Sequence, residues 1–399
     1  MGSRPGDRFC LKAALTSQES PRMHIITAGL GIFLIIFILW DAFETMVLPR
    51  RVTKKIRLAR LFYRYSWAPW WTIAMRMKHP GRRENFLSFF GPLSLLFLIV
   101  IWAVVLVLGF ALLHSSLGHL SDGGLSSEFF TDMYMSGTTF FTLGLGDITP
   151  RSGISRILTV VEAGMGFGFL ALIISYLPVL YQAFSNREVN ISLLDARAGS
   201  PPTAFELLKR ANHDFESMSE FLRDWERWSA ELLESQLSYP TLGFYRSQHS
   251  NQSWLTALVT ILDACTLIIA GKIGPVHQAR LTFAMARHAL IDLAQVYGTP
   301  PRLMEEARLD TGMLSVIVME LKKAGFKIKE NNNKIQIASD DLRMLYEPYA
   351  FSLSLLFLFK LPEWKAARPH HDNWQSHPWK EFLTLAESRK KQQRMFDHF

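Results

Sequence analysis

Three long runs of apolar residues dominate the first half of the chain, at residues 24–48, 86–113 and 154–184. A helix needs about 20 predominantly apolar residues to cross the hydrocarbon core of a bilayer, and each run reaches that length. The first run is long for the core of a secretory signal, and no small-residue cleavage site follows it. The pattern therefore predicts three retained transmembrane helices.

The pattern changes at residue 185, where charged residues become frequent and apolar positions recur with a helical period. We expect one long helix over residues 203–236, with Thr203 as N-cap and Glu206 three residues later, as in a capping box. Residues 252–271 are the most apolar of this half, but they contain Asp263. We expect them to form a buried helix of a soluble core, with Asp263 as a satisfied polar group. Further helices are expected at residues 275–297, 301–324 and 340–358, and a small hairpin at 326–337.

The basic residues are concentrated between the first two apolar runs. Residues 50–83 contain arginine and lysine but no acidic residue, whereas Asp122, Glu128, Asp132 and Asp147 lie between the second and third runs. The positive-inside rule places the loop 49–85 in the cytosol, the segment 1–23 outside, and residues 185–399 in the cytosol. The net charge of +8 is therefore a feature of the membrane surface and does not indicate nucleic-acid binding.

Part of the basic loop, residues 57–77, mixes arginines with Trp67, Trp70 and Trp71. This mixture is typical of a helix in the lipid headgroup layer, and a packed cytosolic linker is the alternative. Asp41 and Glu44, at the inner end of the first run, are expected to pair with Arg50 or Arg51.

Other chemistry has little support in the sequence. The two cysteines, Cys10 and Cys265, are too far apart to indicate a disulfide framework or a cysteine-rich metal site. His370, His371, Asp372 and His377 could bind a metal, but a charged tail explains them more simply. Nucleophile patterns of the Ser/His/Asp or Cys/His type have no recognisable local context, so we expect no enzymatic activity.

The segment TTFFTLGLGDITP, residues 138–150, separates the second and third runs and has glycines at alternate positions. A cation that crosses a bilayer loses its water, and an unpaired charge in a low-dielectric medium costs on the order of tens of kcal/mol. Backbone carbonyls replace that water when the chain alternates between ordinary and left-handed conformations. Gly144 and Gly146 adopt the left-handed state at little cost. Thr142 adds a hydroxyl at the inner end of this row, and Asp147 follows where the chain turns outward.

The residues before this segment predict a short helix at 127–141, with Ser127 as N-cap and Glu128 in its first turn. Its carboxyl end would point into the membrane, where the negative end of the helix dipole favours a cation. The helix and the extended segment after it together form a re-entrant loop. Non-helical backbone at membrane depth is tolerated only where it lines a water-filled path or is buried in protein.

The motif Thr142-Leu143-Gly144-Leu145-Gly146-Asp147 resembles the filter of potassium channels, whose common form is Thr-Val-Gly-Tyr-Gly-Asp. The order of outer helix, pore helix, filter and inner helix over residues 86–184 resembles the pore module of that superfamily. The first run and the cytosolic domain lie outside this module and resemble a bacterial branch. The resemblance implies a homotetramer, because each chain supplies one of four pore loops. It also implies potassium ions at the carbonyls of Thr142, Leu143, Gly144 and Leu145, and no other cofactor.

Two positions depart from the common filter. Leu143 replaces the usual Val, and Leu145 replaces a Tyr whose hydroxyl braces the filter in related channels. Because Leu donates no hydrogen bond, potassium-selective and non-selective cation conduction stay open as alternatives. We expect Glu162 and Tyr134 to support the filter, although Glu162 could instead contribute charge near the conduction path.

The third run contains the candidate gate. Gly166 aligns with the hinge glycine of the superfamily, but small residues here could simply permit close helix packing. On that alignment Phe167, Leu170 and Ile174 line the inner cavity, and Pro178 bends the helix near its cytosolic end.

The sequence thus predicts an all-α membrane protein with three transmembrane helices, a re-entrant pore helix and filter, and a mostly helical cytosolic domain. We expect a passive potassium channel in a bacterial inner membrane, embedded among lipids. A non-selective channel of the same fold and a non-conducting membrane sensor are the alternatives. A potassium uptake transporter is disfavoured, because the related transporters carry four pore repeats in one chain.

Overall fold

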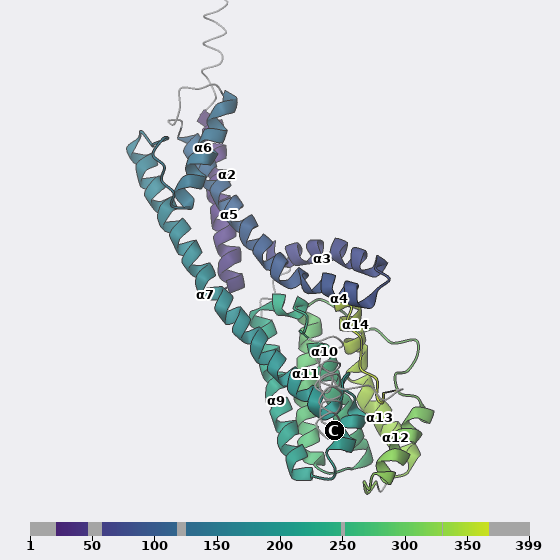
Figure 1. Cartoon of the computed structure of the whole chain (residues 1–399). Coiled ribbons are helices and arrows are strands. Elements are labelled where there is room, and N and C mark those ends of the chain that lie inside the picture. The colour runs from purple at the N-terminus through teal and green to yellow at the C-terminus, as the bar shows by residue number, and fades with distance from the viewer. Residues whose placement is uncertain (1–20, 47–57, 118–124, 249–251, 329, 367–399) are drawn as a thin grey trace, which may run out of the picture. The chain divides into compact units, whose positions relative to one another are not determined.

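The computed structural model of the protein describes residues 21–46, 58–117, 125–248, 252–328 and 330–366. Within these residues every regular element is a helix. Residues 1–70 and 92–181 group into a first unit, and residues 71–91 and 182–399 group into a second. Helices α3, α5 and α7 each contribute residues to both units, so they are covalent links between them (Figure 1).

The first six helices are α2 (Pro21–Met46), α3 (Leu58–Arg76), α4 (Pro80–Ser88), α5 (Phe90–Ser116), α6 (Leu125–Phe140) and α7 (Gly153–Ala198). Among the described helices, four are long and apolar enough to cross a membrane, and α2, α5 and α7 belong to this group. These three overlap the three apolar runs of the sequence. The fold is therefore that of an all-α membrane protein, as predicted.

The core of the first unit lies where α2, α5, α6 and α7 meet. Ile38 of α2, Trp102 and Leu106 of α5, Phe140 of α6 and Phe169 of α7 are buried in one cluster. Close approach of α2 and α5 depends on small residues, because a Cβ on Gly31 would lie 2.6 Å from the Gly109 carbonyl oxygen. Trp102 Nε1 also donates a hydrogen bond to Asp41 Oδ2 over 3.0 Å. The charge pattern did not predict this partner for Asp41, and Arg50 and Arg51 lie outside the described residues.

The remaining helices belong to the second unit. They are α8 (Ala204–Arg210), α9 (Phe215–Ser238), the short 3-10 helix η1 (Pro240–Phe244), α10 (Trp254–Gly271), α11 (Val276–Val296), α12 (Thr311–Lys323), α13 (Asn332–Met344) and α14 (Glu347–Phe357). Helix α10 forms the centre of this unit and packs against α8, α11, α13 and α14. It is the fourth helix with the length and composition of a membrane span, yet 94% of its apolar window is buried inside the unit. Its surroundings match the prediction of a buried core helix.

Asp263 in α10 has a full set of partners. Arg308 Nη2 lies 2.6 Å from Asp263 Oδ2, and the Tyr346 hydroxyl donates to Asp263 Oδ1 over 2.5 Å. Arg308 Nη1 also contacts Glu347 Oε1 at 3.0 Å, and the guanidinium stacks on the Trp364 ring. Burial alone would lower the pKa of Arg308, but the charge of Asp263 raises it above its ordinary value. Burial also raises the pKa of Asp263, although the charge of Arg308 opposes this shift. The hydrogen bonds from Arg308 and Tyr346 confirm the prediction of a satisfied core group.

Several predicted elements of the second unit differ from the structure. The long helix expected over residues 203–236 is two helices, α8 and α9, because Asp214 caps a new helix by accepting from Ser217 N. Thr203 caps α8 by accepting from Glu206 N, as predicted. The hairpin predicted at residues 326–337 is wrong, since α13 begins at Asn332 with Asn331 as its cap.

Three other helix boundaries also differ from the prediction. Residues 301–310 are not helical, and α12 begins only at Thr311. The helix expected at residues 340–358 is instead the end of α13 followed by α14, with a break after Met344. Helix α7 continues to Ala198, well beyond the expected end at residue 184. The charged residues that signalled a new domain are thus on the same helix as the third apolar run.

Candidate functional site

The predicted filter begins directly at the end of α6, which starts at Leu125, so Ser127 lies inside the helix and not at its cap. Leu143 N donates to Thr138 O over 2.8 Å, and Thr142 N donates to Thr139 O over 2.9 Å. This pair of hydrogen bonds is the Schellman motif, which needs a left-handed residue after the last helical turn. Thr142 supplies it with φ = 58°, at a position where glycine is the usual choice. The motif turns the chain sharply away from the helix axis.

The backbone after α6 is non-helical and has positive φ at alternate residues. The values are 58° at Thr142, 55° at Gly144 and 79° at Gly146. Left-handed backbone at two of these positions is adopted at little cost because the residues are glycines. Figure 1 shows the chain turning back from the end of α6 towards the start of α7.

The side chains of this segment are open to the surroundings in a single chain. Leu143 and Leu145 are 64% and 63% exposed, and Thr142, Gly144, Gly146 and Asp147 are exposed as well. A Cβ added to Gly144 or Gly146 would meet nothing within 4 Å inside the chain. The reason for glycine here is therefore the left-handed backbone and not crowding by this chain.

Tyr134 of α6 holds the outer end of the segment. Its hydroxyl donates a hydrogen bond to Asp147 Oδ2 over 2.9 Å. The bond ties the residue after the second glycine back to α6. Leu145 has no side-chain donor, so the side-chain hydrogen bond to this segment comes from Tyr134. Support of a filter by Tyr134 stays a prediction.

Gly166 of α7 lies against the end of α6. A Cβ at this position would lie 1.9 Å from the Phe140 carbonyl oxygen and 2.8 Å from its carbonyl carbon. Neither Gly164 nor Gly168 has such a neighbour within 4 Å. The geometry gives Gly166 a packing reason to be glycine, and α7 is one continuous helix through both Gly166 and Pro178. The hinge role stays a prediction.

Glu162 of α7 is fully buried and contacts two other helices. Its Oε1 lies at hydrogen-bond distance from Ser136 Oγ of α6, and its Oε2 lies 3.1 Å from His114 Nε2 of α5. Sequence reasoning named Glu162 but missed His114 and Ser136. Their polarity could have identified them, because both lie on helices whose other buried residues are mostly apolar.

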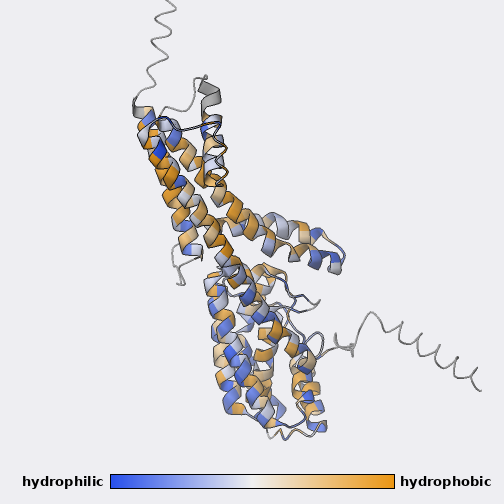
Figure 2. Ribbon diagram, turned by 60° about the vertical axis from the view of Figure 1, so that its left-hand side comes forward, coloured by the Kyte–Doolittle hydropathy of each residue, from blue (hydrophilic) through white to orange (hydrophobic). Residues whose placement is uncertain are grey.

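The predicted cavity residues share one open face of α7. Phe167, Leu170 and Ile174 are 68%, 53% and 63% exposed in the single chain. Their spacing of three and four residues puts them on the same side of the helix. Figure 2 shows many hydrophobic residues along the membrane-length helices of the first unit. The role of the three residues in lining a cavity stays a prediction.

A loop of the second unit contacts both helices that flank the pore loop. Arg187 of α7 is buried and donates to Leu242 O over 2.8 Å and to Tyr245 O over 2.9 Å. Arg246 Nη1 lies 3.2 Å from Glu84 Oε1 of α4, and burial lowers the pKa of Arg246 to about 10 although Glu84 opposes the shift. Phe90 at the start of α5 packs on Phe244 with ring centroids 5.2 Å apart. We call residues 240–246 the junction loop.

The basic loop of the sequence is also resolved in part. Helix α3 carries Trp67, Trp70 and Trp71, and Trp71 Nε1 donates to Leu355 O of α14 over 3.3 Å. Residues 71–91 group with the second unit, which fits the packed-linker alternative for this half of the loop. The amino-terminal arginines and lysines of the loop, up to Arg57, lie outside the described residues.

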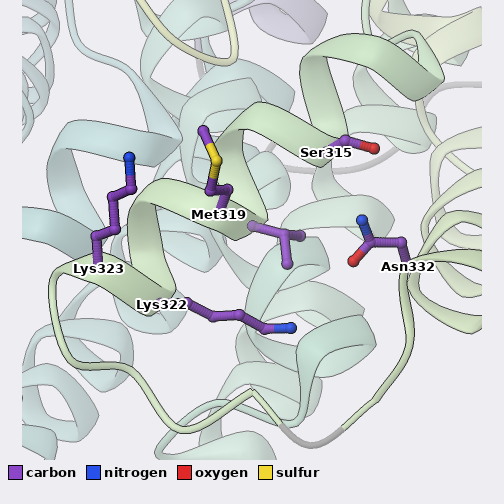
Figure 3. Close-up of a pocket in the computed structure, with 6 residues that line it drawn as sticks. Ser315, Met319, Lys322, Lys323 and Asn332 are labelled. Atoms are coloured by element: carbon purple, nitrogen blue, oxygen red, sulfur yellow. The ribbon is translucent and has the colours of Figure 1, made fainter.

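One hollow on α12 is a poor candidate for a ligand site. It has a volume of about 440 Å³ and is lined by Ser315, Val318, Met319, Lys322, Lys323 and Asn332. Figure 3 shows the side chains of Lys322 and Lys323 extending in different directions, so their charges do not converge. In the described part of the chain no cluster of three potential metal ligands occurs, and His370, His371, Asp372 and His377 lie outside that part.

Comparisons with known proteins point to the same region. A family model described as an ion channel matches residues 96–182. The chain is 26% identical over 199 residues to the uncharacterized membrane protein YdjJ of Bacillus subtilis, covering 49% of this chain and 58% of that protein. The chain thus spans less than two thirds of the length of this relative. No solved structure matches the chain. Residues 96–182 are therefore similar to an ion-channel domain, and the chain is similar to a membrane protein.

Proposed function

We propose that the protein is a potassium-type cation channel that conducts passively through a homotetrameric pore. The observation that carries this proposal is the alternation of positive φ at Thr142, Gly144 and Gly146, in a segment held between two membrane-length helices. Alternation of this kind presents a row of carbonyl oxygens, which match the lost hydration of a cation without a fixed countercharge. The match of residues 96–182 to an ion-channel family supports the same function.

The exposed surface of the first unit supports assembly around an axis. The apolar window of α7 is only 17% buried in the single chain, and both leucines of the filter are exposed. Lipid covers the outer part of such a surface, but an ion path cannot face lipid. Four copies would enclose the segment and convert one wall into a pore.

The second unit is proposed to act on the pore through the junction loop. This loop binds Arg187 of α7 and packs on Phe90 of α5, so a movement of the loop pulls on the inner ends of both helices. The orientation rule places this unit in the cytosol. A cytosolic signal would therefore reach the pore through α5 and α7.

A flux experiment tests the conduction proposal. Purified protein in liposomes loaded with potassium should take up radioactive rubidium, and Gly144→Ala should abolish uptake because alanine is strained at φ = 55°. Gly153→Ala is the matched control, because Gly153 is the first residue of helix α7 and has no neighbour within 4 Å. Uptake equal in wild type and Gly144→Ala, or absent in wild type, contradicts the proposal.

Selectivity separates the two channel alternatives. A potassium-selective filter gives a reversal potential near the potassium equilibrium value under opposed potassium and sodium gradients. A reversal potential near zero keeps the pore but assigns it to a non-selective cation channel. The absence of any current would favour a membrane sensor whose function is in the second unit.

The junction loop has its own test. Arg187→Met removes two hydrogen bonds to the loop and should change open probability while leaving the reversal potential unchanged. Arg223→Met on the exposed face of α9 is the control. A change in reversal potential without a change in open probability would contradict the coupling role.

A further inference from the structure

Three helices of the first unit meet through polar side chains at Glu162. His114, Ser136 and Glu162 have relative exposures of 1%, 0% and 0%, so no water reaches them from outside the unit. Ser136 Oγ lies within hydrogen-bond distance of Glu162 Oε1 and 2.8 Å from the Val107 carbonyl oxygen of α5. A chain of contacts therefore runs from α5 through α7 and α6 back to α5.

The number of available hydrogens determines which group donates in each of these contacts. A serine hydroxyl has one hydrogen to donate, and a backbone carbonyl such as that of Val107 only accepts. If Ser136 donates to Val107, its contact with Glu162 is a hydrogen bond only when the carboxyl group carries the hydrogen. If Glu162 were ionised, one of the two contacts of Ser136 would join two oxygens without a hydrogen between them. Each contact has a hydrogen of its own only when Glu162 is protonated, because an ionised Glu162 would have to share the serine hydrogen with the Val107 carbonyl.

The contacts of His114 are consistent with a neutral imidazole beside a neutral carboxyl group of Glu162. His114 Nε2 lies 3.1 Å from Glu162 Oε2 and donates to it when the ring carries its hydrogen on Nε2, and His114 Nδ1 has no hydrogen-bond partner in the described part of the chain. A doubly protonated imidazolium would leave a buried N–H donor at Nδ1 without an acceptor, which is costly. A neutral ring with its hydrogen on Nε2 leaves only an unused acceptor there.

The other charged groups near this point do not change the result. Asp132 is buried on α6 one turn before Ser136. Arg156, near the start of α7, donates from Nε to Pro150 O over 3.2 Å. Among the described residues, His114 is the one basic group within ion-pair distance of Glu162.

We propose that Glu162 keeps its proton and joins His114, Ser136 and Val107 into a neutral hydrogen-bonded clasp that positions the pore helix. The clasp holds α6 against α5 and α7, one turn before α6 ends and the filter begins. Because the clasp is neutral, it fixes the filter without adding an off-axis anion that competes with the carbonyl row for the cation. Its effect on conduction rests on the proposed channel function, but its chemistry does not.

Paired variants of Glu162 test the clasp. In Glu162→Gln the amide oxygen accepts from His114 and the amide N–H donates to Ser136, so the neutral pattern is retained without a titratable group. We expect Glu162→Gln to keep the reversal potential and melting temperature of wild type. Glu162→Ala should lower the melting temperature and shift the reversal potential towards zero. If Glu162→Gln is as damaged as Glu162→Ala, an ionised Glu162 is required and the proposal is wrong.

Infrared spectroscopy tests the proton directly and does not depend on conduction. The difference between wild type and Glu162→Gln at neutral pH should contain the C=O stretching band of a protonated carboxyl group, shifted by deuterium exchange. A difference spectrum with only carboxylate bands overturns the clasp. If wild type passes no cation but shows the band, the channel proposal fails while the clasp stands.

Discussion

Helices α10 and α7 have similar apolar windows but opposite surroundings. The window of α10 is 94% buried by its own unit, whereas that of α7 is 17% buried. The second unit closes a core around its apolar helix, and the first unit leaves most of the apolar window of α7 exposed in the single chain. Hydropathy therefore identifies a candidate span, but only the surrounding residues show whether a helix needs a membrane.

Buried carboxylates show the same contrast. Asp263 of the second unit is held by the fixed cation Arg308, with Arg308 Nη2 2.6 Å from Asp263 Oδ2. Glu162 of the first unit has a titratable histidine and a hydroxyl instead. The second unit satisfies a buried acid with an ion pair, and the first unit satisfies one with a network that carries no net charge. Variants in both units test whether this difference between them holds.

Gly166→Ala should have the largest effect. The new methyl would lie 1.9 Å from the Phe140 carbonyl oxygen, and neither backbone has room to move without displacing the pore helix. We expect loss of assembled, conducting protein, measured by size-exclusion chromatography in detergent and by rubidium flux. Gly168→Ala, which meets nothing within 4 Å, should behave as wild type. Equal behaviour of the two variants would show that α6 and α7 do not approach closely.

Arg308→Met should be the next most damaging change. It leaves Asp263 and Glu347 buried without their shared cation, and breaking a buried ion pair costs about 3–5 kcal/mol. Chemical denaturation of the full chain, followed by tryptophan fluorescence, should show earlier unfolding of the second unit. The double variant Arg308→Met with Asp263→Leu should recover much of the loss, because no unpaired charge remains at Asp263. A single variant as stable as wild type would contradict the ionic core.

Leu258→Ala and Phe167→Ala compare the two apolar helices directly. Leu258 of α10 is fully buried, so truncation should cost about 2–5 kcal/mol of unfolding free energy. Phe167 of α7 is 68% exposed in the single chain, so truncation should barely change the stability of the fold. We expect the Phe167 variant to alter conductance or block instead, measured as single-channel current. If Phe167→Ala destabilised the fold and left the single-channel current unchanged, Phe167 would not lie on the pore face of α7.

The hydrogen bond between Tyr134 and Asp147 should make the smallest contribution, and Tyr134→Phe tests it. The substitution removes one hydrogen bond to Asp147, and this bond contributes little to stability because it is exposed in the single chain. We expect a normal fold with faster loss of current during sustained opening, measured in planar bilayers. Asp147→Asn should give a milder change, because an amide oxygen still accepts from the tyrosine. Unchanged kinetics in Tyr134→Phe would mean that the bond does not brace the filter.

Sequence patterns predicted the membrane part of the fold better than the rest. The runs of apolar residues predicted α2, α5 and α7, because a helix that crosses a bilayer needs about 20 predominantly apolar residues. The second unit was predicted less well, since helix breaks there depend on local caps such as Asp214 and Asn331, which compete with a continuous periodic pattern. The extension of α7 to Ala198 was missed because a change of composition does not end a helix.

The candidate site was predictable where backbone conformation needs a particular residue. Alternate glycines indicated left-handed backbone at Gly144 and Gly146, but Thr142 adopts it too, and that choice follows from the turn at the end of α6. The contacts of Gly166, His114 and Ser136 could not be predicted, because they depend on how three helices approach one another. Hydropathy reports that a helix is apolar and gives no information on which of its faces meet.

The most direct test of the channel proposal is the reversal potential of wild-type protein in a planar bilayer with potassium chloride concentrated on one side. We predict a current that reverses near the potassium equilibrium potential and disappears in Gly144→Ala. A reversal potential of the opposite sign would mean an anion pathway. No current in wild type, or a current that persists unchanged in Gly144→Ala, would contradict a pore lined by residues 142–147.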